Sequence, residues 1–240
     1  MKRTPKLLLV AMAFAAPMVA KADALDEGRV KELVYEAIRE NPDIVMEALA
    51  ELQKRQAAAE ATNASDFLAA ERDVIERDPN APVLGNPEGD VTVVEFFDYN
   101  CPYCRRAAPE VDALIAKDRN IRLVYREWPI LGEGSVFAAR AALASRKQGK
   151  YPEFHAAMMR LQGRAEEESV LRVAAEIGLD IDRLRQDMTA PEIEEHIATS
   201  MRLTRGLGFQ GTPSFVIGDG LVPGFADRSQ LEDYVAKARN

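Results

Sequence analysis

Cys101 and Cys104 are the two cysteines of this 240-residue chain, and Pro102 and Tyr103 separate them. A thiol pair at this spacing can alternate between dithiol and disulfide, with a thiolate as the attacking species. A strand-like apolar run precedes the pair, and a helical pattern begins at Pro102. We therefore expect Cys101 at the amino end of a helix, where free N–H groups and the helix dipole favour a thiolate and lower its pKa. Cys104, one turn further on, can then attack a mixed disulfide formed at Cys101.

Three other uses of the cysteine pair compete with this redox chemistry. A structural disulfide would close a ring of about four residues and gain only ~2 kcal/mol, much less than a disulfide that closes a long loop. A zinc site would need more ligands, and His155 and His196 lie far away without ligand spacing. Two thiolates could bind Cu(I), which we keep as a secondary ligand. Otherwise we expect no cofactor and no resident metal.

Glu95 is unusual because it lies inside the apolar run, six residues before Cys101. Burial of a carboxylate is costly unless it is paired or protonated. One interpretation is a carboxylate at the end of a strand that reaches water. The other interpretation, which we favour, is an acid with a raised pKa that accepts the proton of Cys104 as that sulfur becomes a nucleophile.

Thr212 and Pro213 come directly before a second strand-like run. Proline is tolerated at the start of a strand, so the local sequence alone gives little reason for a cis peptide bond here. A cis Thr212–Pro213 bond would expose backbone groups that can pair with an extended peptide.

The elements that position these residues alternate between strand and helix. Two apolar runs on either side of a helical pattern predict a parallel β-α-β unit. A block of helices follows, then two short strands and a final helix. In chain order the predicted segments are a strand at 91–97, a helix at 102–117, a strand at 121–128, helices from 135 to about 207, strands at 214–217 and near 221–222, and a helix at 228–238.

The composition is that of an acidic globular protein. Apolar residues make up 47% and charged residues 29%, and the formal net charge is −8. An acidic surface excludes nucleic-acid binding through a basic face, so we expect no nucleic-acid partner.

The first 22 residues predict a signal peptide. They combine a basic start, an apolar run from Leu7 to Val19, and the sequence Ala20-Lys21-Ala22 at the end. A transmembrane anchor is the alternative, but it needs about 20 apolar residues, and Lys21 ends the run too early. Export would place both cysteines where disulfides persist, in a protein that is soluble after cleavage.

Residues 23–80 predict an N-terminal helical segment, separated by turn-rich sequence from a second domain at 81–240. Asn41-Pro42 interrupts the helical pattern, and residues 56–63 are either continuous helix or a frayed linker. The apolar stripes are too narrow to bury much area alone, so they must pack on each other, on the second domain as a lid, or on another copy of the chain. The first stripe consists of Val30, Leu33, Val34, Ala37 and Ile38.

Residues 94–104 (VEFFDYNCPYC) and 211–218 (GTPSFVIG) together resemble the DsbA-like thioredoxin-fold family of thiol–disulfide oxidoreductases. The resemblance covers about residues 82–240. It implies an α/β thioredoxin fold with a helical insertion at about 134–207, a redox-active pair at Cys101 and Cys104, and a cis bond before Pro213. Glu95 matches a buried acidic position of that family. Substrate binding is expected at Tyr103, Thr212 and Pro213.

Residues 41–45 (NPDIV) and 127–132 (EWPILG) are similar to the ScsC (suppressor of copper sensitivity) branch. This resemblance implies homo-oligomers, including trimers, formed through residues 23–80. It also implies a location in the periplasm, exported proteins with cysteines as substrates, a membrane thiol reductase as partner, and a link to copper tolerance.

Two departures from the DsbA oxidase affect the expected direction of the reaction. Tyr103 stands where that oxidase has a histidine that helps to stabilise the thiolate, and Thr212 before the proline resembles the isomerases. Both favour a disulfide isomerase or reductase. A dithiol oxidase is the alternative in the same class, and a Cu(I)-binding protein that uses the same thiolates is the alternative in another class.

Overall fold

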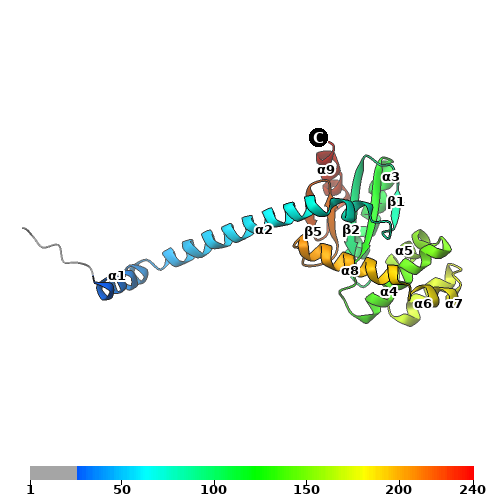
Figure 1. The fold of residues 1–240 in the computed structure, drawn as a ribbon, viewed down its shortest axis with the longest axis horizontal. Coiled ribbons are helices and arrows are strands. Elements are labelled where there is room, and N and C mark those ends of the chain that lie inside the picture. Colours follow the sequence, from blue (N-terminus) through cyan, green and yellow to red (C-terminus); the bar gives the residue numbers. More distant parts are fainter. Residues whose placement is uncertain (1–25) are drawn as a thin grey trace, which may run out of the picture. The chain divides into compact units, whose positions relative to one another are not determined.

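The computed structural model describes residues 26–240, so the predicted signal peptide at 1–22 lies outside the described residues. Contacts divide the chain into two units, residues 1–55 and 56–240, and each is described by itself (Figure 1). Within the described part, no helix has both the length and the apolar character needed to cross a membrane.

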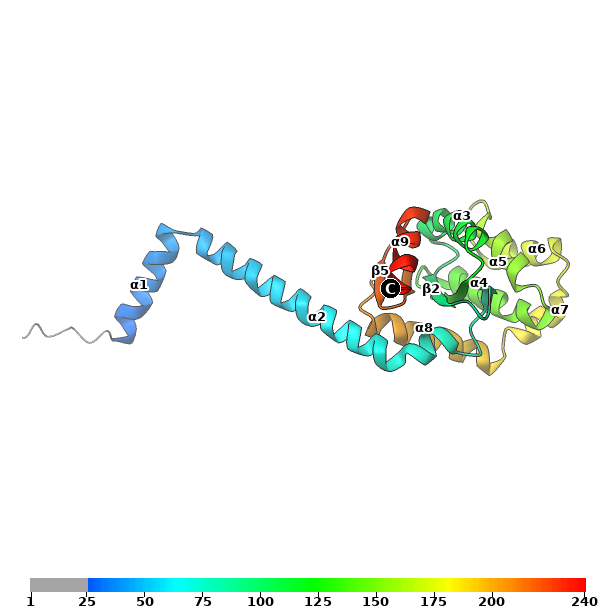
Figure 2. The ribbon, with the colours of Figure 1, turned by 90° about the horizontal axis from the view of Figure 1, so that it is seen from above.

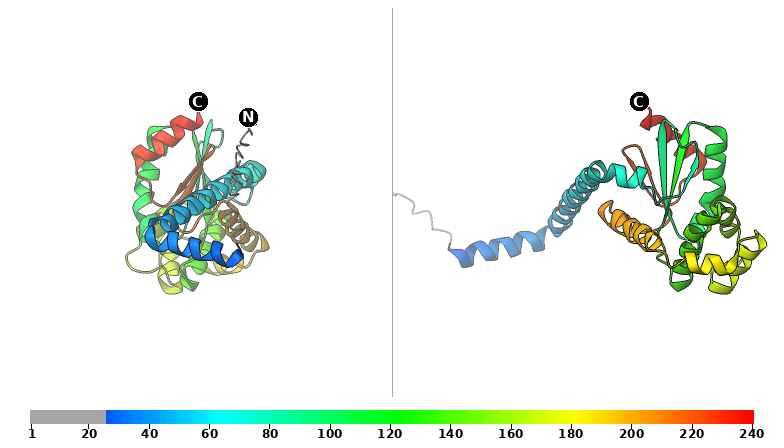
Figure 3. Two further views of the ribbon diagram at one scale, coloured as in Figure 1. Left: turned by 90° about the vertical axis from the view of Figure 1, so that its left-hand side faces the viewer. Right: turned by 45° about the vertical axis from the view of Figure 1, so that its right-hand side comes forward.

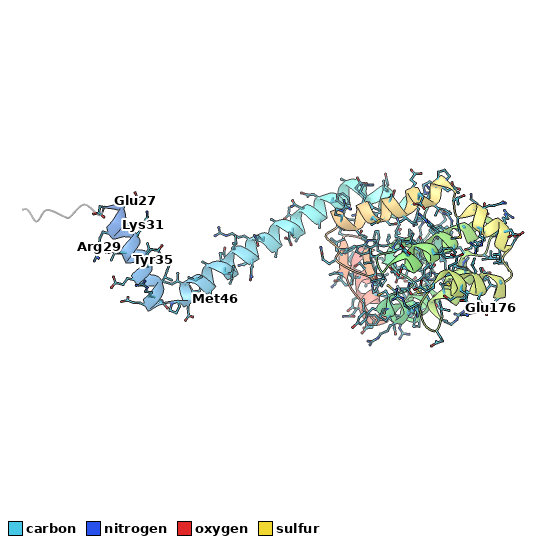
Figure 4. All side chains as sticks on the ribbon, turned by 90° about the horizontal axis from the view of Figure 1, so that it is seen from below. Glu27, Arg29, Lys31, Tyr35, Met46 and Glu176 are labelled. Atoms are coloured by element: carbon cyan, nitrogen blue, oxygen red, sulfur yellow. The ribbon has the colours of Figure 1, made fainter. Side chains whose placement is uncertain are left out.

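The described part of the first unit is helical. Helix α1 spans Glu27–Glu40. Its N-cap is Asp26, whose side chain accepts a hydrogen bond from the Arg29 backbone N–H at 2.7 Å. The helix ends at the predicted Asn41-Pro42 interruption, and α2, Asp43–Arg77, begins directly after it. No residue of α1 is buried. Tyr35 and Met46, labelled in Figure 4, are 64% and 63% exposed.

Helix α2 is continuous through residues 56–63, where the sequence left two alternatives open. Its later turns belong to the second unit and bury Leu68 and Ile75. Two arginines of the neighbouring sheet bind the end of this helix. Arg126 forms an ion pair with Asp78 at 2.7 Å, and Arg122 donates a hydrogen bond to a carbonyl of the last turn. Cations at this position complement the negative end of the helix dipole.

The second unit contains a five-stranded mixed sheet with the order β1-β3-β2-β4-β5. The central strand β2, Val91–Phe97, pairs in parallel with β3, Ile121–Glu127, and α3, Pro102–Lys117, connects them. This β-α-β unit confirms the sequence prediction. Strand β4, Ser214–Ile217, pairs with β2 in the antiparallel direction and carries the edge strand β5, Gly220–Pro223, at its other side. The opposite edge is β1, Val83–Gly85, which the sequence analysis missed.

Helices cover both faces of the sheet (Figures 2 and 3). One face packs against α3, α9 (Arg228–Ala238) and most of the inserted helices, and the other packs against the later turns of α2 and the second half of α8 (Pro191–Gly206), which is the last inserted helix. Full burial on both faces explains why β2 has no alternation of apolar and polar residues. The remaining helices are α4, Glu133–Ser145; α5, Tyr151–Met159; α6, Glu167–Glu176; and α7, Ile181–Asp187, with a short 3-10 turn at Arg146–Gln148.

Candidate active site

Cys101 occupies the N-cap position of α3, with Pro102 in the first turn of that helix. Strand β2 ends at Phe97, and a tight turn carries the chain from the strand into the helix. In this turn the Cys101 N–H donates to the Asp98 carbonyl at 3.0 Å, and the Asn100 N–H donates to the Asp98 side chain at 2.7 Å. The predicted place of Cys101, after a central strand and at the start of a helix, is confirmed.

The surroundings of Cys101 favour its thiolate. The hydrogen bond from the Cys104 thiol, helped by the Thr212 side chain and by the backbone N–H groups of Cys104 and Tyr103, lowers the pKa of Cys101 to about 6. Burial of Cys101 opposes this shift without cancelling it. In its thiol form Cys101 donates a hydrogen bond to the Thr212 carbonyl at 3.1 Å.

Cys104 lies in the opposite environment. Its side chain is fully buried, and burial raises the pKa of the thiol far above its usual value, with further contributions from the hydrogen bond to Cys101 and the charge of Glu95. The two sulfurs of one short motif therefore differ strongly in acidity. This difference can give a nucleophile that is ionised at neutral pH and a second thiol that needs a base before it reacts.

Glu95 lies in the middle of β2, opposite Tyr125 on one neighbouring strand and Phe215 on the other. Only 1% of Glu95 is exposed, and within residues 26–240 its Oε1 atom has no hydrogen-bond partner. Burial, with smaller contributions from Asp112 and Cys101, raises the pKa of Glu95 to about 8. The interpretation of Glu95 as a strand-end carboxylate in contact with water is therefore wrong. The structure shows a buried acid that can be protonated near neutral pH.

The Thr212–Pro213 peptide bond is cis, as the family resemblance implied. It lies just before β4, and the pairing of β4 with β2 brings this loop to Cys101 although the two contacting residues are 111 positions apart. Tyr103, in the first turn of α3, is 58% exposed. The two cysteines therefore lie at the loop that contains Thr212 and Pro213, and Tyr103 between them in sequence is exposed.

Asp98 is a site residue that the sequence analysis missed. Its side chain is buried, and one carboxylate oxygen accepts hydrogen bonds from the backbone N–H groups of Ile130 and Leu131 at 2.8 and 2.9 Å. These two bonds hold the loop after β3 against the turn that carries Cys101. The Asp98-Tyr99-Asn100 segment indicates a turn from its sequence alone. Its bonds to residues more than 30 positions away could not be found that way.

Asn100 and Arg105 connect the same turn to the inserted helices. The Asn100 side chain donates to the Ala165 carbonyl at 3.0 Å and accepts from the Ala165 N–H at 2.7 Å. Arg105 donates to the carbonyls of Leu161 and Gly163 at 2.9 and 2.7 Å. These bonds fix the inserted helices relative to Cys101.

The two histidines are core residues. His155 Nδ1 lies 3.2 Å from the Tyr99 hydroxyl, and burial lowers the pKa of His155 to about 4. His196 Nε2 lies 2.7 Å from a carboxylate oxygen of Glu127, whose other oxygen accepts a hydrogen bond from Tyr151 at 2.6 Å. Within residues 26–240, no group of three or more histidine, cysteine, aspartate or glutamate side chains is arranged to hold a metal ion.

Comparison with protein families gives two matches. The model of a family described as DSBA-like thioredoxin domain matches residues 92–236. A second model, described as Copper resistance protein ScsC N-terminal domain, matches residues 26–59. Together with the mixed sheet and its inserted helices, these matches confirm the predicted fold class and the predicted resemblance.

Several solved structures are similar to this chain, including the following three. A thioredoxin-like oxidoreductase from Silicibacter pomeroyi is 67% identical, with a TM-score of 0.70 over 70% of this chain and 97% of its own. The thiol-disulfide exchange protein alpha-DsbA2 from Wolbachia pipientis is 34% identical, with a TM-score of 0.69 over 75% and 97%. A linker-deletion and N6K mutant of Proteus mirabilis ScsC is 27% identical, with a TM-score of 0.69 over 92% and 98%.

Sequence similarity also extends to part of a larger protein. The chain is 33% identical to the Na(+)/H(+) antiporter NhaA 3 of Salinispora tropica over 137 residues, which is 56% of this chain. It spans only 21% of the length of that antiporter.

Proposed function

We propose that this chain, which belongs to the DSBA-like thioredoxin family, is a periplasmic thiol–disulfide oxidoreductase that isomerises or reduces disulfides in exported proteins. The observation that carries the proposal is the unequal acidity of the two cysteines. The pKa of Cys101 is lowered to about 6, whereas burial raises the pKa of Cys104. The basic and apolar start of the sequence supports export.

The reaction begins when the Cys101 thiolate attacks one sulfur of a substrate disulfide. A mixed disulfide forms, and the other substrate sulfur leaves as a thiolate. In isomerisation, a substrate thiolate attacks the mixed disulfide and regenerates the Cys101 thiolate with no net change of oxidation state. In reduction, Cys104 attacks instead, the ionised form of Glu95 accepts its proton, and both substrate sulfurs leave reduced. A membrane thiol reductase then supplies two electrons to the resulting disulfide of the enzyme.

Tyr103, Thr212 and Pro213 are the proposed substrate-binding residues. The Thr212 carbonyl lies 3.1 Å from the Cys101 sulfur, so a peptide bound along this loop would present its cysteine to the nucleophile. The Tyr103 ring is exposed and offers apolar surface to an unfolded chain. Tyr103 and Thr212 also favour isomerisation or reduction, because Tyr103 stands where a strong oxidase has a histidine and Thr212 before the proline resembles the isomerases.

The proposal is tested by incubating the full-length chain with a substrate protein whose disulfides have been scrambled. An isomerase restores native disulfides at catalytic concentration and without added oxidant. Fast oxidation of a reduced peptide with little unscrambling would instead identify a dithiol oxidase. Tight Cu(I) binding with negligible turnover in either assay would identify a metal-binding protein, and the proposed activity would be wrong.

We further propose that residues 23–80 assemble the chain into a homo-oligomer, with a trimer as our expectation. Within residues 26–55 no residue is buried, and several apolar side chains are exposed: Val30 is 43% exposed, Leu33 39% and Val34 51%. Apolar residues at this spacing on one helix face fit an intermolecular helix seam. Several catalytic units around one cleft would raise the effective concentration of thiols near a trapped substrate.

Replacing Leu33 and Ile38 together with aspartate should give monomers that retain normal Cys101 reactivity. These monomers should lose most of the isomerase activity and keep simple dithiol oxidase activity. Light scattering measures the assembly, and the two enzyme assays measure the activities. Lys31→Asp on the same helix is the matched control and should remain oligomeric. A wild-type chain that is monomeric at micromolar concentration would contradict the proposal, and the helices would then be a lid on their own molecule.

A further inference from the structure

A pocket lies away from the cysteines, within the second unit. It has a volume of about 400 Å³ and is bounded by the end of α2, strand β1 and the start of α5. None of the candidate active-site residues lines this pocket. Three of its lining residues are the arginines Arg77, Arg122 and Arg146, and much of the remaining wall is apolar, formed by Pro79, Ala81, Pro82, Val83, Leu84 and Pro152.

The three arginines have no carboxylate partner within residues 26–240, in a chain whose net charge is −8. Arg146 donates to backbone carbonyls, including that of Pro79 at 3.1 Å. Arg122 donates through one terminal nitrogen to the Glu76 carbonyl. Arg77 is exposed and lies close enough for its charge to lower the pKa of Arg122, after the larger effect of burial. Glu76 and Glu88 act on Arg122 through their charges, as Glu192 does with Arg146, but in the described part of the chain none of these carboxylates forms an ion pair with them.

Arg122 is the most informative member of this group. It is only 8% exposed, and its Nε–H has no hydrogen-bond partner in the described part of the chain. A buried, unpartnered donor on a charged group is costly and rare in native proteins. Nearby carboxylates do not remove the cost, because Glu76 pairs with Arg72 at 3.0 Å and Asp78, which also lines the pocket, pairs with Arg126 at 2.7 Å.

Because much of the wall is apolar, the pocket favours a ligand whose anionic group is attached to an apolar body. Tyr151 lines it, but its hydroxyl already donates to Glu127 at 2.6 Å, so its ring is the part left for a ligand. A volume of about 400 Å³ is in the range of small-molecule sites. Guanidinium groups match the planar geometry of carboxylates and phosphates and can bind them through two hydrogen bonds.

We propose that this pocket binds a small organic oxyanion, with Arg77 and Arg122 holding its charged oxygens and the proline-rich wall holding an apolar body. The shared chemistry is a carboxylate or phosphate group on a small apolar or aromatic body. The negative charge of the ligand would offset part of the charge of Arg122, whose Nε atom itself is inaccessible to solvent. The site is separate from disulfide exchange and does not depend on the proposed function.

Titration with phenyl phosphate and with benzoate tests the proposal, with benzyl alcohol as the neutral control. Calorimetry should show saturable binding of at least one anion to one site with a Kd of about 1 mM or tighter. The side-chain Nε–H signal of Arg122 in a ¹H–¹⁵N spectrum should shift in step with that binding. The two anions distinguish phosphate esters from carboxylic acids. No saturable binding of either anion, or equal binding of benzyl alcohol, would overturn the proposal.

Arg77→Gln should weaken anion binding at least about tenfold and leave disulfide exchange unchanged. The matched control is Arg119→Gln, which removes the same charge from another exposed arginine outside the pocket. If both substitutions weakened anion binding equally, the effect would be one of general charge, and the proposed site would be wrong. Arg122 also binds the end of α2, so Arg122→Lys, which keeps the charge and loses the planar group, is the suitable second variant. It too should weaken binding if the site is correct, and full retention would exclude Arg122 as a ligand.

Discussion

Replacing Cys101 with serine should abolish disulfide exchange, whereas replacing Cys104 with serine should preserve the first step and trap substrates as mixed disulfides. The reason is that only Cys101 has a pKa below neutral, about 6, and only its sulfur is placed at the Thr212 carbonyl. Loss of the nucleophile should reduce the exchange rate at least about a thousandfold. The rate is measured with a disulfide substrate, and the trapped complexes are measured by non-reducing electrophoresis.

The two single-cysteine variants also serve as controls for each other, because the chain has two cysteines in total. The variant that retains Cys101 should still be alkylated quickly at pH 7, because the Thr212 side chain and the backbone N–H groups at positions 103 and 104 continue to lower the pKa of Cys101 after the Cys104 thiol is lost. The variant that retains Cys104 should react slowly at the same pH, because burial both shields the thiol and raises its pKa. Equal alkylation rates in the two variants would contradict the assignment of Cys101 as nucleophile.

Glu95→Gln should slow the resolution of the mixed disulfide much more than its formation. Resolution requires Cys104 to lose its proton, and Glu95 is the buried acid whose charge already affects the pKa of that thiol. Formation requires only the Cys101 thiolate, which does not need a base at neutral pH. Single-turnover kinetics from pH 6 to 8 separate the two steps. Unchanged resolution across this range would show that Glu95 is a tolerated residue of the sheet and not a proton acceptor.

The same substitution should change the pH dependence of stability. The pKa of Glu95 is about 8 in the folded chain and 4.5 in its ordinary state, so the folded state holds a proton that the unfolded state releases between these values. Stability therefore falls as the pH rises from 5 to 8, by about 3 kcal/mol from this group. Glu95→Gln should remove this fall in the free energy of unfolding. Denaturant unfolding at several pH values between 5 and 8 measures it. The control Glu153→Gln, on the exposed side of α5, should leave it unchanged.

The order of the catalytic elements could be predicted because their signals are local. The apolar run ending at Phe97, the cysteines that follow and the helical pattern from Pro102 are adjacent in sequence, and the structure places β2, the turn and α3 there. Strand β1 was missed because three residues within turn-rich sequence give no periodicity, and β1 exists through its pairing with β3. Residues 56–63 are compatible with helix or linker, and the structure continues α2 through them to its buried turns.

By itself, the sequence determined that a thiol pair lies at the amino end of a helix, and its motifs indicated the family. Only the tertiary structure decided which groups surround that pair. The contact between Cys101 and Thr212 spans 111 positions, and the burial of Glu95 depends on strands on both sides of β2. The buried Arg122, facing a pocket without a carboxylate partner in the described part, also became visible only after folding. Periodicity reports the local backbone, whereas burial and pairing depend on the register of strands that are distant in the chain.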